Sequence, residues 1–274
     1  MFGIGVGIRV GGRTPVGGSA YDADAQAFFD RVTTAGGTLT TTEKNATNQL
    51  VLDMKSAGIW TSMKAVYPMV GASAAACAQN LKSSSFTGTF SSGWTFASTG
   101  VTPNGTSAYM TTGFVPSANL SATSQSSSFY SRTNSVFGAT LNVDFSGVSA
   151  AGNFTIMACL NSGGINFFNR YGNAGDVRNT SAQRYDGFFV GSRTSATMHK
   201  GWRSNVLLGT DTNSRSGIST VAPTLGAEND GATRLFFCTH EYAFAHIGDG
   251  LTDTQASDFY TAVQAFQTTL ARNV

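Results

Sequence analysis

Charged residues are scarce in this sequence. Lys, Arg, Asp and Glu make up 12% of its 274 residues, about half the usual share, and the formal net charge is +2. The basic residues are scattered and form no run, which argues against a nucleic-acid-binding surface. No apolar stretch reaches the roughly 18 residues of a membrane span, and the N-terminus lacks the basic region of a signal peptide. We therefore expect no nucleic-acid partner and no membrane insertion.

Cysteine is equally sparse. Cys77, Cys159 and Cys238 are far apart, odd in number and lack a C-x-x-C pair. This spacing argues against a disulfide framework and against a zinc cluster. We expect three buried free thiols in a chain that is made in a reducing cytoplasm.

The abundant residues indicate a large β-rich core under a polar, weakly charged surface. Hydrophobic residues make up 41% of the chain, and twenty of its residues are Phe. That content is too high for a disordered chain, and the length fits one large all-β domain or two smaller ones. Ser, Thr, Gly and Asn replace charge at the surface, a composition that is common in extracellular β-proteins and in virion proteins.

Residues 1–20 form a glycine-rich arm. Within it, MFGIGVGIRVGG alternates apolar residues with glycine, as half of a β-strand would. Such a stretch cannot bury itself, and glycine raises the entropy lost when the segment is ordered. We expect it to dock on another protein or a second copy by strand addition, through Phe2, Ile4, Val6 and Ile8. A frayed tail is the alternative.

Residues 21–67 are predicted to form a helical hairpin. The first helix has its N-cap at Asp22 or Asp24, and a capping box at Thr40–Glu43 opens the second. Residues 59–68 read as a third short helix or a turn. The apolar face of this hairpin requires a covering partner.

Residues 68–248 change to short segments rich in Phe, Tyr, Val and Thr, separated by turn clusters such as TPNGTS, NSGG and ENDG. Regular short strands without helical crossovers predict antiparallel sheets. Residues 249–274 turn helical again, with a second capping box at Thr252–Gln255. The predicted fold is mainly β: an antiparallel β-sandwich with its C-terminal helix over 68–274, preceded by the helical hairpin.

Three passages resemble concanavalin A-like (laminin G-like) jelly rolls. They are GVTPNGTSAYMTTGFVPSANL at 100–120, GWRSNVLLGTDTNS at 201–214 and FAHIGDGLTDTQASDFYTAVQAFQ at 244–267. The helical stretch at 22–71, followed by this sandwich, resembles a recurrent architecture of bacteriophage structural proteins that are tail- or capsid-associated. The resemblance covers nearly the whole chain after residue 20 and implies a lectin-like jelly roll carried by a virion protein.

Catalytic patterns are incomplete. Glycosidases of this fold commonly read E-x-D-x-x-E; the E-N-D run at 228–230 begins such a motif, but Thr233 stands where the second Glu belongs. Cys238, His240 and His246 would share one face of a strand, placing a thiol near an imidazole. Their aromatic neighbours favour core or interface histidines instead. We therefore expect no enzymatic activity.

Ligand binding through loops is the remaining chemistry. Calcium is the one cofactor left open, because loops can assemble a site from single aspartates, here Asp144, Asp176, Asp186, Asp211 and Asp230. A sugar needs an exposed aromatic ring beside polar loop groups. Turn-rich stretches flank four aromatic candidates for such a contact, each of which could equally lie in the core or at a strand edge: Trp94, Tyr171, Tyr185 and Trp202.

Together these patterns predict a non-enzymatic phage structural protein located in the virion, as a tail- or baseplate-associated fibre or knob. A capsid decoration or head-fibre protein is one alternative. A carbohydrate-binding module for host surface glycans is another. The expected partners are other virion proteins and further copies of this chain, for example in a trimer, with host surface carbohydrate as a further partner.

Overall fold

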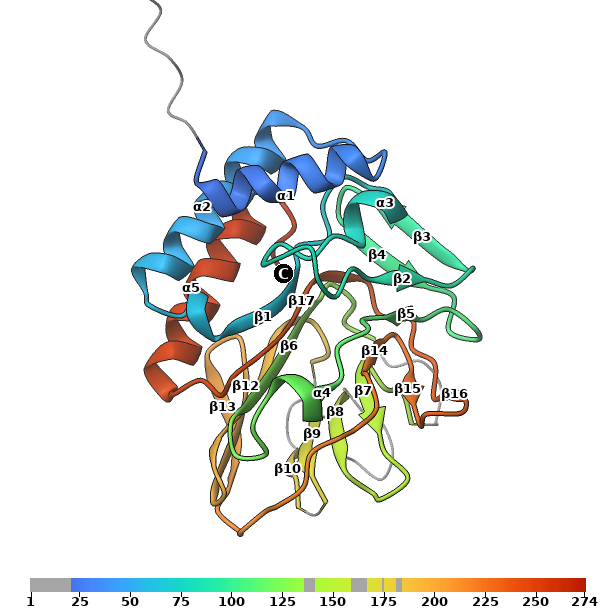
Figure 1. Ribbon diagram of the computed structural model, residues 1–274, viewed down its shortest axis with the longest axis vertical. Coiled ribbons are helices and arrows are strands. Elements are labelled where there is room, and N and C mark those ends of the chain that lie inside the picture. The colour runs from blue at the N-terminus through green and yellow to red at the C-terminus, as the bar shows by residue number, and fades with distance from the viewer. Residues whose placement is uncertain (1–20, 136–140, 159–166, 174, 181–183) are drawn as a thin grey trace, which may run out of the picture.

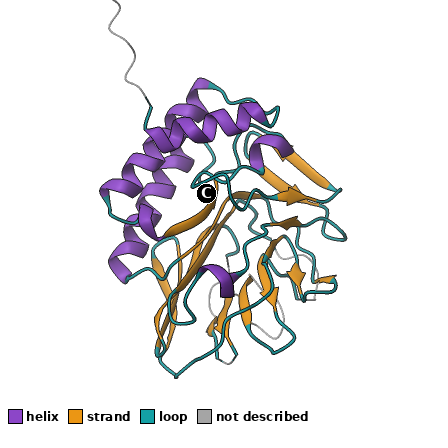
Figure 2. Cartoon of the chain, viewed as in Figure 1, coloured by secondary structure: helices purple, strands orange, loops and turns teal. Residues whose placement is uncertain are grey.

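The computed structural model describes residues 21–135, 141–158, 167–173, 175–180 and 184–274. A layer of helices packs on one β-sheet, and that sheet packs on a second (Figures 1 and 2). One hydrophobic cluster fills the space between helices and first sheet, and another fills the space between the two sheets. The predicted mainly β fold, with antiparallel sheets and a C-terminal helix, is confirmed.

The first sheet, sheet A, contains eight strands among the described residues, all paired antiparallel. Strand β17 is central: β6 pairs along one side, while β1 and β4 share the other. In spatial order the strands are β13 (Val206–Asp211), β12 (Met198–Arg203), β11 (Gly187–Ser195), β6 (Gln125–Ser131), β17 (Tyr242–Gly248), β4 (Gly100–Pro103) and β3 (Trp94–Ala97), with β1 (Met63–Tyr67) beside β17.

The second sheet, sheet B, has nine strands in the described part of the chain. Its pairs are antiparallel except for β15 and β7, which run parallel. The spatial order is β10 (Val177–Asn179), β9 (Phe167–Gly172), β8 (Phe154–Ala158), β7 (Phe145–Val148), β14 (Thr224–Leu225), β5 (Met110–Thr111) and β2 (Thr89–Phe90), with β15 (Glu228–Asn229) beside β7 and β16 (Arg234–Leu235) beside β15.

The helices begin where the sequence places their caps. The side chain of Asp22 caps α1 (Ala23–Thr34), and complete capping boxes open α2 (Thr41–Ser56) and α5 (Asp253–Thr269). The shorter helices are η1 (Trp60–Ser62), α3 (Ala74–Cys77) and α4 (Pro116–Asn119). None of the described helices is both long enough and apolar enough to span a membrane.

Helix α5 joins the helical layer to sheet A. The Phe259 ring lies 5.2 Å from the ring of Phe188 on β11 and 5.9 Å from that of Phe244 on β17. At its C-terminal end the buried guanidinium of Arg272 donates to Gln267 Oε1 and to three backbone carbonyls, those of Pro68, Met69 and Ala243. The predicted apolar stripe of this helix is therefore confirmed, and it packs on the sandwich.

The prediction of a third short helix or turn at 59–68 is wrong for its second half. After the 3-10 turn η1, residues Met63–Tyr67 form β1 and pair with β17. Met63 and Val66 face the helical layer, while Ala65 and Tyr67 face the second sheet. A strand buried on both faces lacks the alternation of apolar and polar residues that identifies a half-buried strand.

Candidate functional site

The outer surfaces of the two sheets are covered in different ways. On sheet B the side chains of Val143, Ile156 and Ala158 are buried in a small hydrophobic cluster, and Phe154 and Phe168 pack against it. Helices α1, α2 and α5 lie against sheet A on the side away from sheet B (Figure 1). On the outer surface of sheet B, the neighbouring strands β8, β9 and β10 carry a group that we call the arginine–aromatic strip. It consists of Phe154, Phe168, Arg170, Asp176 and Arg178.

Stacking and ion pairs hold the strip together. The Arg170 guanidinium lies 4.6 Å from the Phe154 ring centre and 5.3 Å from that of Phe168, and Arg178 lies 5.5 Å from Phe168. Asp176 accepts from Arg170 at 2.9 Å and from Arg178 at 2.7 and 2.8 Å. These partners hold the pKa of Asp176 below its ordinary value, although its partial burial acts in the opposite direction. The strip is thus a fixed arrangement of rings and charged groups.

The alternation of β9 explains why the strip faces outward. Phe168 and Arg170 point to one surface, while Asn169 and Tyr171 point into the space between the sheets. Both rings of the strip remain partly exposed, as do the side chains of Arg170 and Arg178, at 21% and 49%. Partly exposed rings beside guanidinium groups can contact a ligand that has both apolar and hydroxyl surfaces.

Glu228 lies further along the same surface. Strand register places Arg170 beside Ile156, Ile156 beside Ser146, and Ser146 beside Glu228. The Ser146 hydroxyl donates to Glu228 over 3.5 Å, and burial raises the pKa of Glu228. Thr233, which replaces the second glutamate of the glycosidase motif, donates to Asp230 in a turn. Thr233 therefore supplies no carboxyl group where the second glutamate of the glycosidase motif would stand.

Three of the four aromatics predicted for glycan contact are buried: Tyr171, Tyr185 and Trp202, with exposed fractions of 1%, 8% and 8%. Tyr171 donates its hydroxyl to a carbonyl inside the sandwich, and Trp202 packs under the helical layer. Because a sugar needs a free ring face, this burial argues against contacts through these three rings. Trp94 is half-buried, 5.1 Å from the Phe90 ring, and remains a prediction.

The five aspartates proposed for calcium do not converge on one site. Asp176, Asp186 and Asp211 each form ion pairs with nearby arginines, and Asp230 holds its own turn. The side chain of Asp144 is buried in a different group, described next. The docking residues of the arm, Phe2, Ile4, Val6 and Ile8, lie outside the described residues, as does Cys159.

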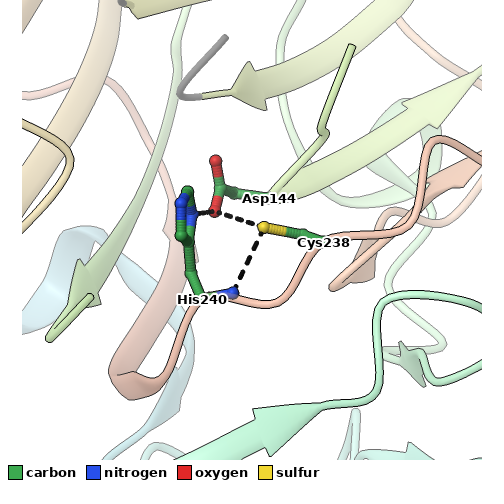
Figure 3. Close-up of side chains that lie close together, drawn as sticks. All are labelled: Asp144, Cys238 and His240. Carbon is green, nitrogen blue, oxygen red and sulfur yellow. Dashed lines mark hydrogen bonds and ion pairs between the residues drawn. The ribbon is translucent and has the colours of Figure 1, made fainter. Parts of the chain in front are cut away.

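Asp144, Cys238 and His240 form a buried cluster at one end of the two sheets (Figure 3). The Nδ1 atom of His240 lies 2.7 Å from Asp144 Oδ1, and the Cys238 thiol donates to the same oxygen over 3.5 Å. The Tyr242 hydroxyl also donates to this oxygen, at 3.0 Å. All four side chains are buried, with exposed fractions of 1% or less. The cluster joins the start of β7 in sheet B to the segment that leads into β17 in sheet A.

The predicted shared face of Cys238, His240 and His246 is correct only for the first two. Between β16 and β17 the chain is not a strand, and Phe236 adopts a positive φ of 53°. Cys238 and His240 lie in this irregular segment, whereas His246 lies in β17 and contacts Ser126 and Ser128. The irregular segment breaks the alternation on which the prediction depended. Cys77 and Cys238 are buried free thiols, as expected.

Electrostatics in the cluster favour a positive charge between its members. Burial by itself lowers the pKa of His240, but Cys238 and Asp144 outweigh it and raise that pKa well above its ordinary value. Burial, followed by the nearby carboxylate of Asp144, raises the pKa of Tyr242. The Cys238 thiol is fully buried among the described residues, so it is not open to a substrate in this structure.

Sequence reasoning missed the strip and found the cluster only in part. Along β8, residues 154, 156 and 158 alternate with residues that point into the space between the sheets. Their common face could therefore have been recognised from the sequence. Whether helices cover that face depends on contacts between distant segments. The arginines escaped notice because they are far in sequence from Phe154, the one aromatic residue of β8.

No known family model matches the sequence, and no curated protein matches it either. Among solved structures, domain 4 of AbnA, a GH43 extracellular arabinanase from Geobacillus stearothermophilus in complex with arabinotriose, superposes with a TM-score of 0.52 at 14% identity. The match covers 72% of this chain and 98% of that one.

Two further structures superpose less well. The NanB sialidase from Streptococcus pneumoniae gives a TM-score of 0.40 at 16% identity, over 50% of this chain and 24% of the sialidase chain. The CBM40 of the Ruminococcus gnavus IT-sialidase gives 0.36 at 14% identity, over 49% of this chain and 80% of that one. By its likeness to domain 4 of AbnA, this protein has a β-sandwich fold.

Proposed function

We propose that this protein is a non-enzymatic carbohydrate-binding domain, and that the arginine–aromatic strip on sheet B is its binding surface. The observation that carries the proposal is a sheet face with two partly exposed rings, Phe154 beside the Arg170 guanidinium and Phe168 beside those of Arg170 and Arg178. The likeness to domain 4 of AbnA, which was solved with arabinotriose, supports it. This reading corresponds to the carbohydrate-binding alternative expected from the sequence.

The chemistry of the strip suits an oligosaccharide. A sugar ring offers C–H groups that pack on Phe154 and Phe168, and its hydroxyls accept from guanidinium N–H groups. Asp176, bound to both arginines, fixes the direction in which those N–H groups point. A pre-ordered surface loses little side-chain entropy when the ligand binds, which favours affinity.

The absence of catalysis is part of the proposal. Retaining glycosidases need two carboxyl groups about 5–5.5 Å apart. Glu228 has the raised pKa of a general acid, but Asp230, which contributes to that shift, is held in its turn by Thr233. Incubation with the bound glycan should therefore release no product, and hydrolysis that disappears in Glu228→Gln would contradict this part.

The binding site is tested by calorimetry with arabinotriose and by a glycan array that identifies the preferred sugar class. Phe154→Ala and Phe168→Ala should each weaken binding at least about tenfold, the equivalent of ~1.4 kcal/mol. Leu207→Ala is the matched control, because this 50%-exposed residue lies on strand β13 of the other sheet. Circular dichroism confirms that each variant is folded.

Two outcomes would contradict the proposal. One is binding that survives both aromatic substitutions, which would move the site away from the strip. The other is a glycan array without any reproducible binding, which would remove the carbohydrate function itself and leave a purely architectural role.

Location in a virion belongs to the same proposal. We infer it from the resemblance of residues 22–71 and the sandwich that follows to phage structural proteins. Immunogold labelling of intact particles distinguishes a tail from a head position, and absence of label on particles would refute it. A chain lacking residues 2–12 tests the docking arm, because full incorporation of that variant would exclude an anchoring role.

A further inference from the structure

The cluster of Asp144, Cys238 and His240 has the composition of a metal site, and it has no part in the proposed glycan binding. It offers one thiolate sulfur, one imidazole nitrogen and one carboxylate oxygen, all within 4.8 Å of one another. This mixture of donors is typical of zinc sites. The three residues are fully buried, which is the environment of a structural ion rather than a catalytic one.

Each of the three side chains also has a hydrogen-bond partner other than the side chains of the cluster. The Nε2 atom of His240 lies 3.1 Å from the carbonyl oxygen of Ser135 and donates to it. The backbone N–H of His240 donates to Cys238 Sγ over 3.4 Å, and the Tyr242 hydroxyl donates to Asp144. Outer partners of this kind orient metal ligands and fix the tautomer of a ligating histidine.

The tautomer of His240 determines which species must lie between its Nδ1 atom and Oδ1 of Asp144. Since a carbonyl can only accept, Nε2 carries a proton, and a neutral His240 then points the Nδ1 lone pair at Asp144. Two lone pairs 2.7 Å apart repel unless a positive species lies between them. That species is either a proton or a metal ion.

The distances are close to what a metal requires. Tetrahedral zinc, with bonds of about 2.0–2.3 Å, places its ligand atoms about 3.3–3.8 Å apart. The Sγ to Oδ1 distance is already 3.5 Å, and the Nδ1–Oδ1 pair has to open by about 1 Å at most. The Tyr242 hydroxyl, which donates to Asp144 Oδ1, is a second oxygen at the same cluster.

We propose that Asp144, Cys238 and His240 bind a structural zinc ion that links the two sheets of the sandwich. Binding would release the Cys238 thiol proton and the proton between His240 and Asp144. The sequence spacing did not indicate such a site, because Asp144 and Cys238 lie 94 residues apart, one just before β7 and the other in the irregular segment before β17.

The test uses cobalt as a spectroscopic substitute for zinc. Because the cluster is closed, the full chain is expressed in cobalt-supplemented medium. We expect one metal ion per chain by elemental analysis and a sulfur-to-cobalt charge-transfer band in the near ultraviolet. Cys238→Ser should remove the band, whereas Cys77→Ser, a change at the other described buried thiol, should keep it.

A second variant keeps all three ligands. Tyr242→Phe removes only an outer hydrogen bond and should weaken metal binding about 10–100-fold in a chelator competition. Wild-type protein without metal or band would overturn the proposal and mean that the cluster holds a proton only. A band that persists in Cys238→Ser would overturn it as well, since the sulfur would then come from elsewhere.

Discussion

His246 should make the stability of this protein sensitive to mild acid. Its ring is fully buried, with Nδ1 2.8 Å from the Ser128 hydroxyl and Nε2 3.2 Å from the Ser126 hydroxyl. The ring centre lies 4.8 Å from that of Phe259. Burial lowers the pKa of this histidine from 6.5 to about 3. The native protein therefore keeps His246 neutral at a pH at which the unfolded chain protonates it.

The sign and size follow from proton linkage. A depressed native pKa gives stability that is complete above pH 6.5 and is lost as the pH falls towards about 3. Each pH unit in that window costs ~1.4 kcal/mol of unfolding free energy, so His246 alone accounts for about 2 kcal/mol between pH 6.5 and about 5. His199, whose pKa burial also lowers to about 3, adds a similar loss.

The assay compares urea unfolding of the wild type and His246→Gln by circular dichroism at pH 7 and at about pH 5, at constant ionic strength with a chelator present. The variant is less stable at pH 7, but its loss on acidification should be smaller by about 2 kcal/mol. Other titrating groups, including Glu228 with its raised pKa, are common to both proteins and cancel. Equal losses in the two proteins would refute the reasoning.

Two further predictions concern stability. Phe259→Ala should lower the free energy of unfolding by about 3–5 kcal/mol, because it leaves a cavity between α5 and sheet A. Leu52→Ala, at a 41%-exposed position, should change that free energy by less than about 0.5 kcal/mol. Urea titration measures both, and similar values would contradict the packing. Arg272→Met should cost about 3 kcal/mol, because buried carbonyls lose their donor, and a melting temperature equal to that of the wild type would count against it.

The predictable parts of this fold are those encoded by neighbouring residues. The capping boxes at Thr40 and Thr252 each depend on two side chains three positions apart, and both helices begin there. The alternation in residues 154–158 likewise predicts a strand, and β8 is present. In these places local geometry and global packing favour the same structure.

The remaining features depend on contacts between distant segments. Apart from Lys64, β1 is apolar because it lies between two cores, so its sequence resembles a buried helix or turn. The segment 236–241 continues an aromatic run, but it leaves the sheet, and only there can Cys238 and His240 reach Asp144. The strip stays partly exposed because the helices cover the other sheet. No short stretch of sequence reveals which sheet the helices cover.

The helical layer on sheet A has a consequence for how tightly this protein can hold a long polymer. On the proposed function, helices occupy one sheet and each chain would present a single sheet surface to a polysaccharide, so one copy would bind it at one place. Several copies fixed to a common support would turn each later attachment into an intramolecular event. Avidity of that kind multiplies retention by about 10²–10⁴ without any new contact, so the spacing of the copies, more than the chemistry of each one, would set the residence time.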